Sequence, residues 1–433
     1  MYDAVVIGGG VAGCTFSSKL SEKGFKTLLI ERKEKEKSGD KICGDGIGKD
    51  VISNLKTHFN IALSGNTIVH ETEGAVVYSP MLKKVHFDSK WFLVSRPLFG
   101  KDLISSAEGN GAEILDNTLC TGLLLENNKV TGVRTKTKNY RARLVVDATG
   151  PFPLIKKCLP DNKYIPKTAG IFDSAVSYRE IVSLKKPIED KSHLHIYFNL
   201  EDIPMGYFWI FPKDNNTVNV GVGNLNTKNP VDIFKKYVKK LNLEIKSVKS
   251  AGGGIIPVRR PAPSFVLDNF MLIGDSASQC SPLHGGGIGN TIKASIVASD
   301  KAVSALENDG LSLKELWGYN SEYMHQHGYR SAREELTKLF VVGLGNEKLE
   351  FLFDAGLMNS IKQKGMAKLG FSSIVPMLIK QPVLGKSVFD YGKRAKAVEE
   401  HYQSYPETPD SFEKWLKKDN ELFEQAKKVY GVK

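Results

Sequence analysis

The sequence predicts a mixed α/β protein, α+β overall, in which a parallel-sheet domain carries an inserted antiparallel sheet and precedes a C-terminal helical region. Short apolar runs that end in small or acidic residues are typical of buried parallel strands. They occur at residues 2–7, 144–147 and 270–273. Alternating apolar residues such as Leu194, Ile196 and Phe198 indicate the antiparallel sheet. Beyond residue 310 the pattern is helical, with breaks at Pro376, Pro382 and Pro409.

The composition is that of an ordinary globular protein. The chain has 433 residues, 41% of them hydrophobic and 25% charged, which excludes disordered and fibrous classes. Its cysteines are odd in number, scattered and free of any C-x-x-C spacing, so we expect reduced thiols inside a cell. They are Cys14, Cys43, Cys120, Cys158 and Cys280.

The charge balance and the apolar segments bear on location. The net charge of +12 suits an anionic membrane surface, a nucleic acid or an acidic partner, and a lysine-rich solvated surface explains it equally well. The N-terminus lacks the features of a signal peptide, and no apolar run is long enough to span a membrane. We therefore expect a cytoplasmic protein that associates peripherally with membranes and does not bind nucleic acid.

A dinucleotide fingerprint opens the chain. Gly8, Gly10 and Gly13 form a G-x-G-x-x-G between a short strand and a helical pattern, and Glu31 follows at the tip of the next strand. These glycines permit a tight turn, close approach to a pyrophosphate and close helix–strand packing. The helix N-terminus favours phosphate, and Glu31 is placed for ribose hydroxyls. A flexible glycine turn is the alternative, and the fingerprint alone does not separate FAD from NAD.

Two later strand ends favour FAD. The strand ending at Asp147 is followed by Ala148-Thr149-Gly150, and the strand ending at Ile273 is followed by Gly274-Asp275. An aspartate such as Asp275 at the carboxyl end of a strand can bind a ribityl hydroxyl, which NAD lacks. A simple Gly-Asp turn is the alternative.

A glycine-rich loop precedes a second helical pattern. Gly286 and Gly287 lie directly before Ile288, where the helix is predicted to begin, so its free amides could stabilise an anionic reduced flavin. His284 in the same loop could contact the ring system or the substrate. A loop histidine bonded to the backbone is the alternative reading.

On these motifs the chain resembles the geranylgeranyl reductase family of flavoproteins, within the para-hydroxybenzoate hydroxylase-like fold group, over residues 1 to about 307. It is closest in pattern to the archaeal enzymes that saturate the prenyl chains of membrane lipids. The further motifs are KICGD at 41–45, a segment at 94–103 that contains Arg96, YFWIFP at 207–212 followed by G-x-G at 221–223, and PVRRP at 257–261. At Gly100 the common family pattern has aspartate, and we expect little from that departure.

The resemblance implies roles for particular residues. It implies FAD contacts from Arg32, Cys43, Gly44 and Arg96, in addition to the positions named above. Cys43 and Asp45 are candidate proton donors, or residues that shape the site. The equally weighted alternative is that Cys43-Gly44 is only a tight turn. No metal site is expected.

The substrate signature also makes physical sense. In a strand, Tyr207, Trp209 and Phe211 share one face and form an aromatic wall that ends at Pro212. Gly221 and Gly223 on the next strand would lie opposite and leave a slot for an isoprenoid chain or a flavin. Without the resemblance, an aromatic stripe of this kind is more often ordinary core.

The expected organisation follows from the motifs. A discontinuous FAD-binding domain comprises residues 1–65, 94–150 and 254–309. A substrate-binding antiparallel domain comprises 66–93 and 151–253, and a C-terminal helical domain comprises 310–433.

The resemblance implies an FAD-dependent reductase that saturates C=C bonds of geranylgeranyl chains by hydride transfer, on archaeal membrane ether lipids first of all. The alternatives are a quinone side chain or geranylgeranyl diphosphate as substrate, a monooxygenase or halogenase, and a non-catalytic prenyl-binding escort protein. The expected partners are a prenylated lipid, an anionic membrane surface and an electron donor, either ferredoxin or NAD(P)H.

Overall fold

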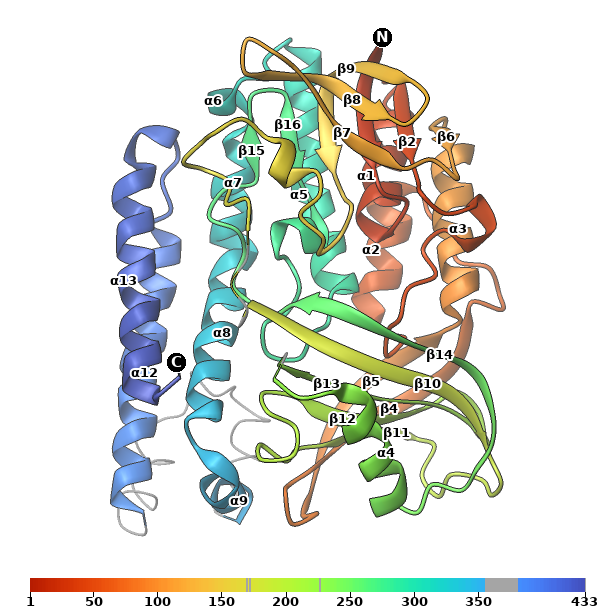
Figure 1. Ribbon diagram of the computed structural model, residues 1–433, viewed down its shortest axis with the longest axis vertical. Helices are drawn as coiled ribbons and strands as arrows, with labels where there is room; N and C mark the ends of the chain where they lie inside the picture. The colour runs from red at the N-terminus through yellow and green to blue at the C-terminus, as the bar shows by residue number, and fades with distance from the viewer. Residues whose placement is uncertain (169, 171–172, 226, 355–380, 433) are drawn as a thin grey trace.

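The computed structural model describes residues 1–168, 170, 173–225, 227–354 and 381–432. Two sheets and a set of helices make up the architecture (Figure 1). The first sheet stands in the upper part of Figure 1, and the second sheet crosses below it. The long C-terminal helices run side by side along one flank.

The first sheet has the order β15-β16-β9-β1-β2-β6. Its strands are β1 (Tyr2–Ile7), β2 (Thr27–Ile30), β6 (Glu113–Leu115), β9 (Asn139–Asp147), β15 (Val266–Leu267) and β16 (Phe270–Leu272). From β16 to β6 neighbouring strands run parallel, and a hairpin of β7 (Cys120–Glu126) and β8 (Lys129–Thr135) extends β9. The predicted Rossmann-like sheet is therefore confirmed.

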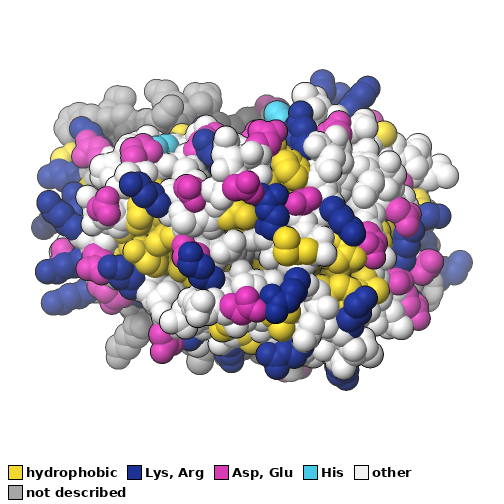
Figure 2. Space-filling model, turned by 90° about the horizontal axis from the view of Figure 1, so that it is seen from above, with side chains coloured by type: hydrophobic (Ala, Val, Ile, Leu, Met, Phe, Trp, Pro, Cys, Tyr) yellow, Lys and Arg dark blue, Asp and Glu magenta, His cyan; other side chains and the backbone are white. Residues whose placement is uncertain are grey.

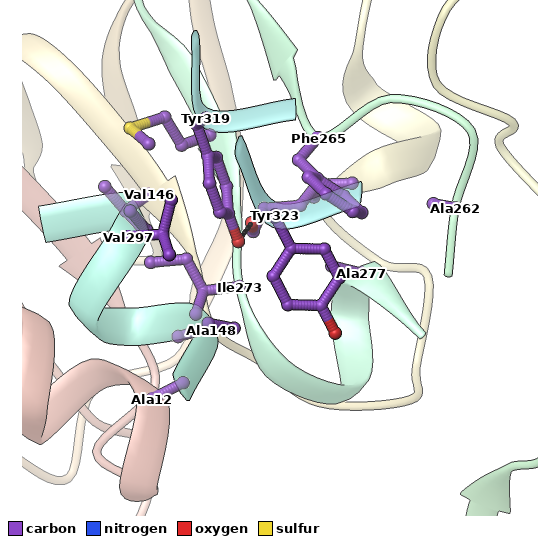
Figure 3. Close-up of a cluster of buried hydrophobic side chains, with 14 of the residues drawn as sticks. Ala12, Val146, Ala148, Ala262, Phe265, Ile273, Ala277, Val297, Tyr319 and Tyr323 are labelled. Carbon is purple, nitrogen blue, oxygen red and sulfur yellow. Dashed lines mark hydrogen bonds between the residues drawn. The ribbon is translucent and has the colours of Figure 1, made fainter. Parts of the chain in front are cut away.

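Four helices pack against this sheet and position the loops at the carboxyl ends of its strands. They are α1 (Val11–Glu22), α2 (Lys49–Phe59), α3 (Arg96–Gly109) and α5 (Ile288–Glu307). Figure 3 shows Val146 of β9, Val297 of α5 and Tyr319 of α7 (Gly318–Tyr323) in one buried cluster with Ala12 of α1. This packing fixes the N-termini of α1 and α5 near the ends of β1, β9 and β16.

The second sheet has the order β14-β10-β13-β12-β11-β4-β5-β3. Its strands are β3 (Gly46–Gly48), β4 (Ile68–Tyr78), β5 (Lys84–Val94), β10 (Ser174–Leu184), β11 (His193–Tyr197), β12 (Tyr207–Pro212), β13 (Thr217–Leu225) and β14 (Ile245–Pro257). The predicted antiparallel pairing holds except between β11 and β4, which run parallel. β3 belongs to this sheet, although the sequence places residues 1–65 with the first domain.

The side chains of β12 alternate between two faces of the second sheet. Phe208 and Ile210 pack against α4 (Pro230–Lys240) in one buried cluster. Trp209 and Phe211 belong to a separate cluster on the other face, with Tyr207 beside them. The aromatic wall thus faces away from α4.

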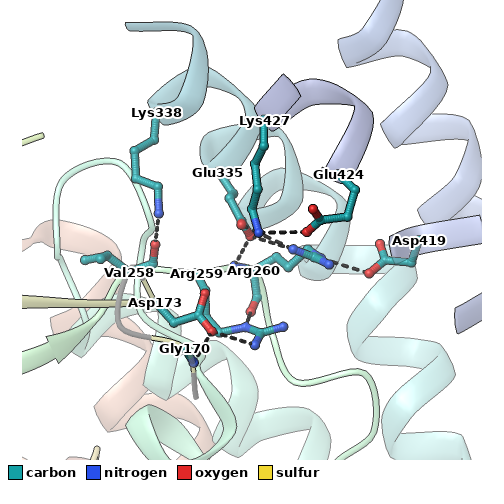
Figure 4. Close-up of polar contacts among 10 residues, drawn as sticks. All are labelled: Gly170, Asp173, Val258, Arg259, Arg260, Glu335, Lys338, Asp419, Glu424 and Lys427. Atoms are coloured by element: carbon teal, nitrogen blue, oxygen red, sulfur yellow. Dashed lines mark hydrogen bonds and ion pairs between the residues drawn. The ribbon is translucent and has the colours of Figure 1, made fainter. Parts of the chain in front are cut away.

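The C-terminal helices are tied to the segment that follows β14. They are α6 (Leu313–Leu316), α8 (Tyr329–Val342), α9 (Gly345–Asp354), α12 (Pro382–Gln403) and α13 (Phe412–Tyr430). Figure 4 shows Arg260 between Glu335 of α8 and Asp419 of α13, with N–O distances of 3.2 and 2.8 Å. Burial raises the pKa of Glu335, but Arg260 and Lys338 outweigh it and lower the pKa to about 2.

The predicted proline breaks differ in role. Pro382 is the first residue of α12, and Pro409 begins a short 3-10 turn before α13, so both start helices. This is the position where proline's missing N–H costs least. Pro376 lies outside the described residues.

Basic and acidic side chains are interspersed on the face seen in Figure 2, with small apolar patches between them. This face therefore carries no large patch of a single sign. Within the described ranges, no helix is both long and apolar enough to cross a bilayer.

Candidate active site

A large cavity lies between the carboxyl end of the first sheet and one face of the second. Its volume is about 1660 Å³, and both sheets contribute to its lining. Pockets for a single small ligand are usually about 300–1,000 Å³. The cavity therefore has room for a dinucleotide and a second ligand together.

The three fingerprint glycines have separate roles. Gly8 has φ +107°, and a Cβ there would lie 2.5 Å from the Ala148 carbonyl oxygen. A Cβ on Gly13 would lie 1.8 Å from the Gly8 oxygen, so Gly13 permits close helix–strand packing. A Cβ on Gly10 would meet no described atom within 4 Å, and Gly10 lines the cavity. Only at Gly10 does the glycine leave room for a ligand.

Two charged side chains near the fingerprint fit a dinucleotide. Glu31 lines the cavity, and its carboxylate accepts hydrogen bonds from the Gly9 and Lys33 amides at 2.6 and 2.8 Å. Arg96 is buried and donates to the Gly39 carbonyl at 2.7 Å. Its Nε and Nη1 have no hydrogen-bond partner among the described residues. These orphaned donors match the needs of a phosphate.

Further predicted cofactor residues lie along the same cavity. Those that line it are Arg32, Ala148, Gly150, Asp275, Gly287 and Ile288. Gly287 caps α5, so the N-terminus of that helix faces the cavity. Gly286 instead faces His284, whose Nδ1 accepts from the Gly286 amide at 3.2 Å. The alternative reading of His284 as a loop histidine bonded to backbone thus has structural support, although His284 also lines the cavity.

Lys41, the first residue of the KICGD motif, lines the cavity but was not predicted as a site residue. Its ammonium group lies 2.5 Å from the Asp275 carboxylate, across 234 positions of sequence. The pKa of Lys41 is raised, chiefly by the charge of Asp275. Because Asp275 is paired in this way, a ribityl hydroxyl would share that carboxylate with Lys41.

A buried hydrogen-bond network connects the aromatic wall to the Cys43 loop. The indole Nε1 of Trp209 donates to Asn219 Oδ1 at 3.0 Å. Asn219 Nδ2 donates in turn to the Cys43 carbonyl at 2.8 Å and to Asp45 Oδ2 at 2.9 Å. Lys213 completes the network with an ion pair to Asp45 at 2.8 Å. The loop is thereby held against β12 and β13.

Asp45 is set back from the cavity, which fits the second of its two predicted roles, that of a residue that shapes the site. Its side chain is fully buried, its carboxylate pairs with Lys213, and it is absent from the described cavity lining. Asp45 therefore positions the loop, and Cys43 is the member of the pair that lines the cavity.

The loop also contacts the aromatic wall directly. A Cβ on Gly44 would lie 2.9 Å from the Phe211 ring, so glycine allows this approach. A second thiol, Cys280, lines the same cavity, and burial raises its pKa well above the ordinary value. Its place in the cavity could not be read from the isolated cysteine in the sequence.

The aromatic wall is formed as predicted in its geometry, but the expected glycine slot is partly filled. The ring centroids of Tyr207 and Phe211 lie 5.9 and 6.1 Å from that of Trp209. A Cβ on Gly221 would lie only 2.3 Å from the Trp209 ring, so the indole itself covers Gly221. Gly223 lines the cavity, whereas Gly221 and Pro212 are absent from the described lining.

Gly100 has a larger role than the sequence suggested. A Cβ at this position would lie 2.2 Å from the Ser38 carbonyl oxygen and 3.0 Å from the Gly39 Cα. The same segment receives the Arg96 hydrogen bond. In this chain any side chain at 100 would displace the loop that Arg96 holds, and the expectation that the departure from aspartate matters little stays a prediction.

Comparisons with known proteins agree with this geometry. Residues 173–255 match the family model of the geranylgeranyl reductase catalytic domain, and residues 3–169 match the model of glucose inhibited division protein A. The chain is 29% identical to the digeranylgeranylglycerophospholipid reductase of Sulfolobus acidocaldarius, over 99% of both chains. It is 28% identical to digeranylgeranylglycerophospholipid reductase 1 of Methanococcoides burtonii, over 88% of this chain and 92% of the relative.

The chain fits the geranylgeranyl reductase family. By family it is an FAD-dependent oxidoreductase. A solved structure from Thermoplasma acidophilum, described as geranylgeranyl bacteriochlorophyll reductase-like, shares the fold with a TM-score of 0.77 at 23% identity. The match covers 90% of this chain and 99% of that one.

Flavin-dependent halogenases share the fold more distantly. The brominase Bmp2 has a TM-score of 0.61 at 16% identity, covering 97% of this chain and 99% of that one. At that identity the likeness concerns the fold alone, so it carries no halogenase assignment to this chain.

Proposed function

We propose that this family member binds FAD in the cavity and saturates C=C bonds in the geranylgeranyl chains of membrane ether lipids. The observation that carries the proposal is a single cavity lined both by the dinucleotide fingerprint and by the aromatic wall of β12. Its volume exceeds the need of one ligand. The names of the two curated relatives support the lipid class.

The residues of the first sheet would hold the cofactor. Gly10 leaves room for the pyrophosphate, the orphaned donors of Arg96 fit its charge, and Glu31 fits a ribose. When bound and reduced, FAD supplies a hydride to the alkene. The N-terminus of α5 at Gly287 favours negative charge at the part of the cavity that it faces.

The residues of the second sheet and the Cys43 loop would hold the alkene. Tyr207, Trp209 and Phe211 exclude water and offer an apolar wall to an isoprenoid chain. An isolated alkene also needs a proton at its second carbon, and the thiol of Cys43 lies in the cavity for that role. Asn219 fixes the loop from which this thiol projects.

We also propose peripheral association with an anionic membrane. Several large apolar residues that line the cavity are exposed, and they offer a chain a path from the bilayer. They are Val69 (41% exposed), Phe152 (52%), Ile255 (37%) and Leu283 (42%). The net charge of +12 would add an electrostatic attraction. The C-terminal region also contains a basic and apolar segment that we would expect at such a surface, and it lies outside the described residues. It comprises Lys362, Lys364 and Lys368 beside Met358, Ile361, Met366 and Leu369.

The narrower alternatives concern the substrate and the electron donor. A prenyl quinone or geranylgeranyl diphosphate would meet the same aromatic wall, and either ferredoxin or NAD(P)H would serve as reductant. A halogenase or monooxygenase would consume oxygen with the reduced cofactor, and an escort protein would show no turnover.

One anaerobic experiment separates these possibilities. The purified holoenzyme is reduced with dithionite and mixed with digeranylgeranylglyceryl phosphate, and the return of oxidised flavin absorbance is followed with the mass of the lipid. Reoxidation with a gain of one H₂ per reduced bond supports the reductase. A lipid that stays unchanged while the reduced flavin persists would reject it.

A further inference from the structure

One buried arginine in the substrate half of the cavity lacks a counter-charge. Arg179 lies in the middle of β10, is 3% exposed and lines the cavity. Its one hydrogen bond runs from Nη1 to Ser250 Oγ at 2.6 Å. Its Nε is buried without a hydrogen-bond partner, and no carboxylate pairs with it in the part of the chain that the structure describes.

Such an arrangement is costly unless something else binds the guanidinium. Arginine stays charged in proteins, and a buried charge without a partner is strongly destabilising. The buried Arg260 shows how this chain pairs a structural arginine, because it contacts both Glu335 and Asp419. Arg96, the other cavity arginine with orphaned donors, is the one already matched to a phosphate of the cofactor. Arg179 thus has the features of a ligand-binding residue.

A bulge in β14 brings a second cation to the same place. Ile181 of β10 pairs with Ser250, but the next residue, Val182, pairs with Val248, so Lys249 is the extra residue in β14. A bulge re-aims side chains, and here both Lys249 and Ser250 line the cavity. The Lys249 ammonium donates to Thr217 Oγ1 at 2.9 Å. Two cationic side chains and two hydroxyl groups therefore line this end of the cavity, which we call the cationic end. They belong to Arg179, Lys249, Ser250 and Thr217.

The neighbouring charged groups do not neutralise Arg179. Lys213 and Asp45 are paired with each other. Asp214 also lines the cavity, but its Oδ1 accepts from the amides of Asn216 and Thr217 in the β12–β13 turn. The Nε of Arg179 remains available to a ligand, whereas the charge of Lys249 is shared with Asp214, whose pKa it helps to lower.

The cationic end adjoins the aromatic wall. Arg179 pairs across the sheet with Gly221, and a Cβ on Gly221 would lie 2.7 Å from Arg179 Cβ and 2.3 Å from the Trp209 ring. Glycine at 221 thus lets the indole and the arginine stem lie together. An apolar wall beside a cationic end matches a molecule with a prenyl chain and an anionic head.

We propose that Arg179, with Ser250 and Lys249, binds the phosphate of the prenyl substrate and so fixes which end of the chain lies at the aromatic wall. The inference rests on the proposed reductase function and adds to it a preference for phosphate-bearing over neutral prenyl substrates. The ligand class is a phosphate monoester, diester or diphosphate, for which arginine's forked donors are well suited.

The test compares two probes that differ only in phosphate. Binding of geranylgeranyl monophosphate and of geranylgeraniol to the oxidised holoenzyme is measured by calorimetry for the wild type, Arg179→Met, Arg179→Lys and Ser250→Ala. Lys246→Met, an exposed change on β14 outside the cavity lining, is the matched control. Melting curves and the flavin spectrum are taken for every variant.

We expect Arg179→Met to raise the Kd for the monophosphate about 30-fold, equivalent to about 2 kcal/mol, and to leave the Kd for the alcohol unchanged. Arg179→Lys should recover part of the loss, Ser250→Ala should show a smaller loss, and Lys246→Met should match the wild type. Equal losses for both probes, or a changed flavin spectrum with unchanged binding of the monophosphate, would overturn the inference. The inference would also be overturned if inorganic phosphate alone competed tightly for the site but left the preference for geranylgeranyl monophosphate over geranylgeraniol unaltered.

The two proposals fail in different ways. Wild-type protein that binds the monophosphate selectively but reduces no prenyl chain would reject the proposed function and keep the phosphate site. Protein that reduces both probes equally well, with no effect of Arg179→Met, would keep the reductase and reject the phosphate site.

Discussion

Asn219→Ala offers the sharpest test of how the site is assembled. The side chain is fully buried and makes three hydrogen bonds, to the Trp209 indole, the Cys43 carbonyl and the Asp45 carboxylate. Neutral hydrogen bonds contribute about 0.5–1.5 kcal/mol each, and one to a charged group about 1.5–3. The variant should therefore lose about 2.5–6 kcal/mol of unfolding free energy.

The matched control is Asn224→Ala on the same strand. Asn224 is also fully buried, and its Nδ2 donates to the Leu225 and Lys228 carbonyls, away from the Cys43 loop. Urea unfolding measures stability, and anaerobic flavin reoxidation by the prenyl lipid measures turnover. We expect both variants to be destabilised, but only Asn219→Ala to lose turnover while still folded. Wild-type stability and turnover in Asn219→Ala would refute the role given to this network.

Four further outcomes are expected. Gly10→Val should fold normally but bind no FAD, as seen from a colourless purified protein, because the new side chain enters only the cavity; stoichiometric FAD would contradict this. Cys43→Ser should slow lipid reduction and Cys43→Ala should slow it more, by about 10²-fold or more if the thiol donates the proton; wild-type rates in both would exclude that role. Gly100→Asp should lower the melting temperature and the affinity for FAD together, and unchanged values would show that the loop adjusts without cost. Burial lowers the pKa of His401 and of His327 from 6.5 to about 4. The unfolding free energy should therefore fall as the pH drops from 6.5 towards 4, because the unfolded chain then binds more protons. The double variant with His401→Gln and His327→Gln should show a flatter pH dependence in urea unfolding, and an unchanged dependence would contradict this.

Local sequence signals predicted most of the fold. The strand at residues 2–7, the strand at 207–212 and the helix from Ile288 lie where the apolar patterns and glycines place them. These elements depend on contacts between near neighbours in the chain, which periodicity reports. The parallel pairing of β4 with β11 could not be foreseen, because the two strands come from separate segments of the second sheet.

The interior of the site was harder to predict because its contacts are long-range. The pairs Lys41–Asp275 and Asp45–Lys213 join residues far apart in sequence. The sequence around each residue does not indicate which residue it pairs with. For that reason the sequence left Asp45 either as a proton donor or as a residue that shapes the site, and it did not reveal the buried pair with Lys213. Arg179 went unnoticed for the same reason, since one arginine in an alternating strand looks like any solvent-facing residue.

The central claim is that this chain saturates prenyl chains of ether lipids, and the mass of those lipids tests it most directly. The chain is co-expressed with a pathway that makes unsaturated archaeal ether lipids and with a reductant system that supplies ferredoxin or NAD(P)H. The lipids are then extracted, and their masses are measured by mass spectrometry. We predict a series of lipids heavier by successive H₂ units, and none of that series with Gly10→Val. Ether lipids that keep every double bond, in cells that contain flavin-loaded wild-type protein, would contradict the account.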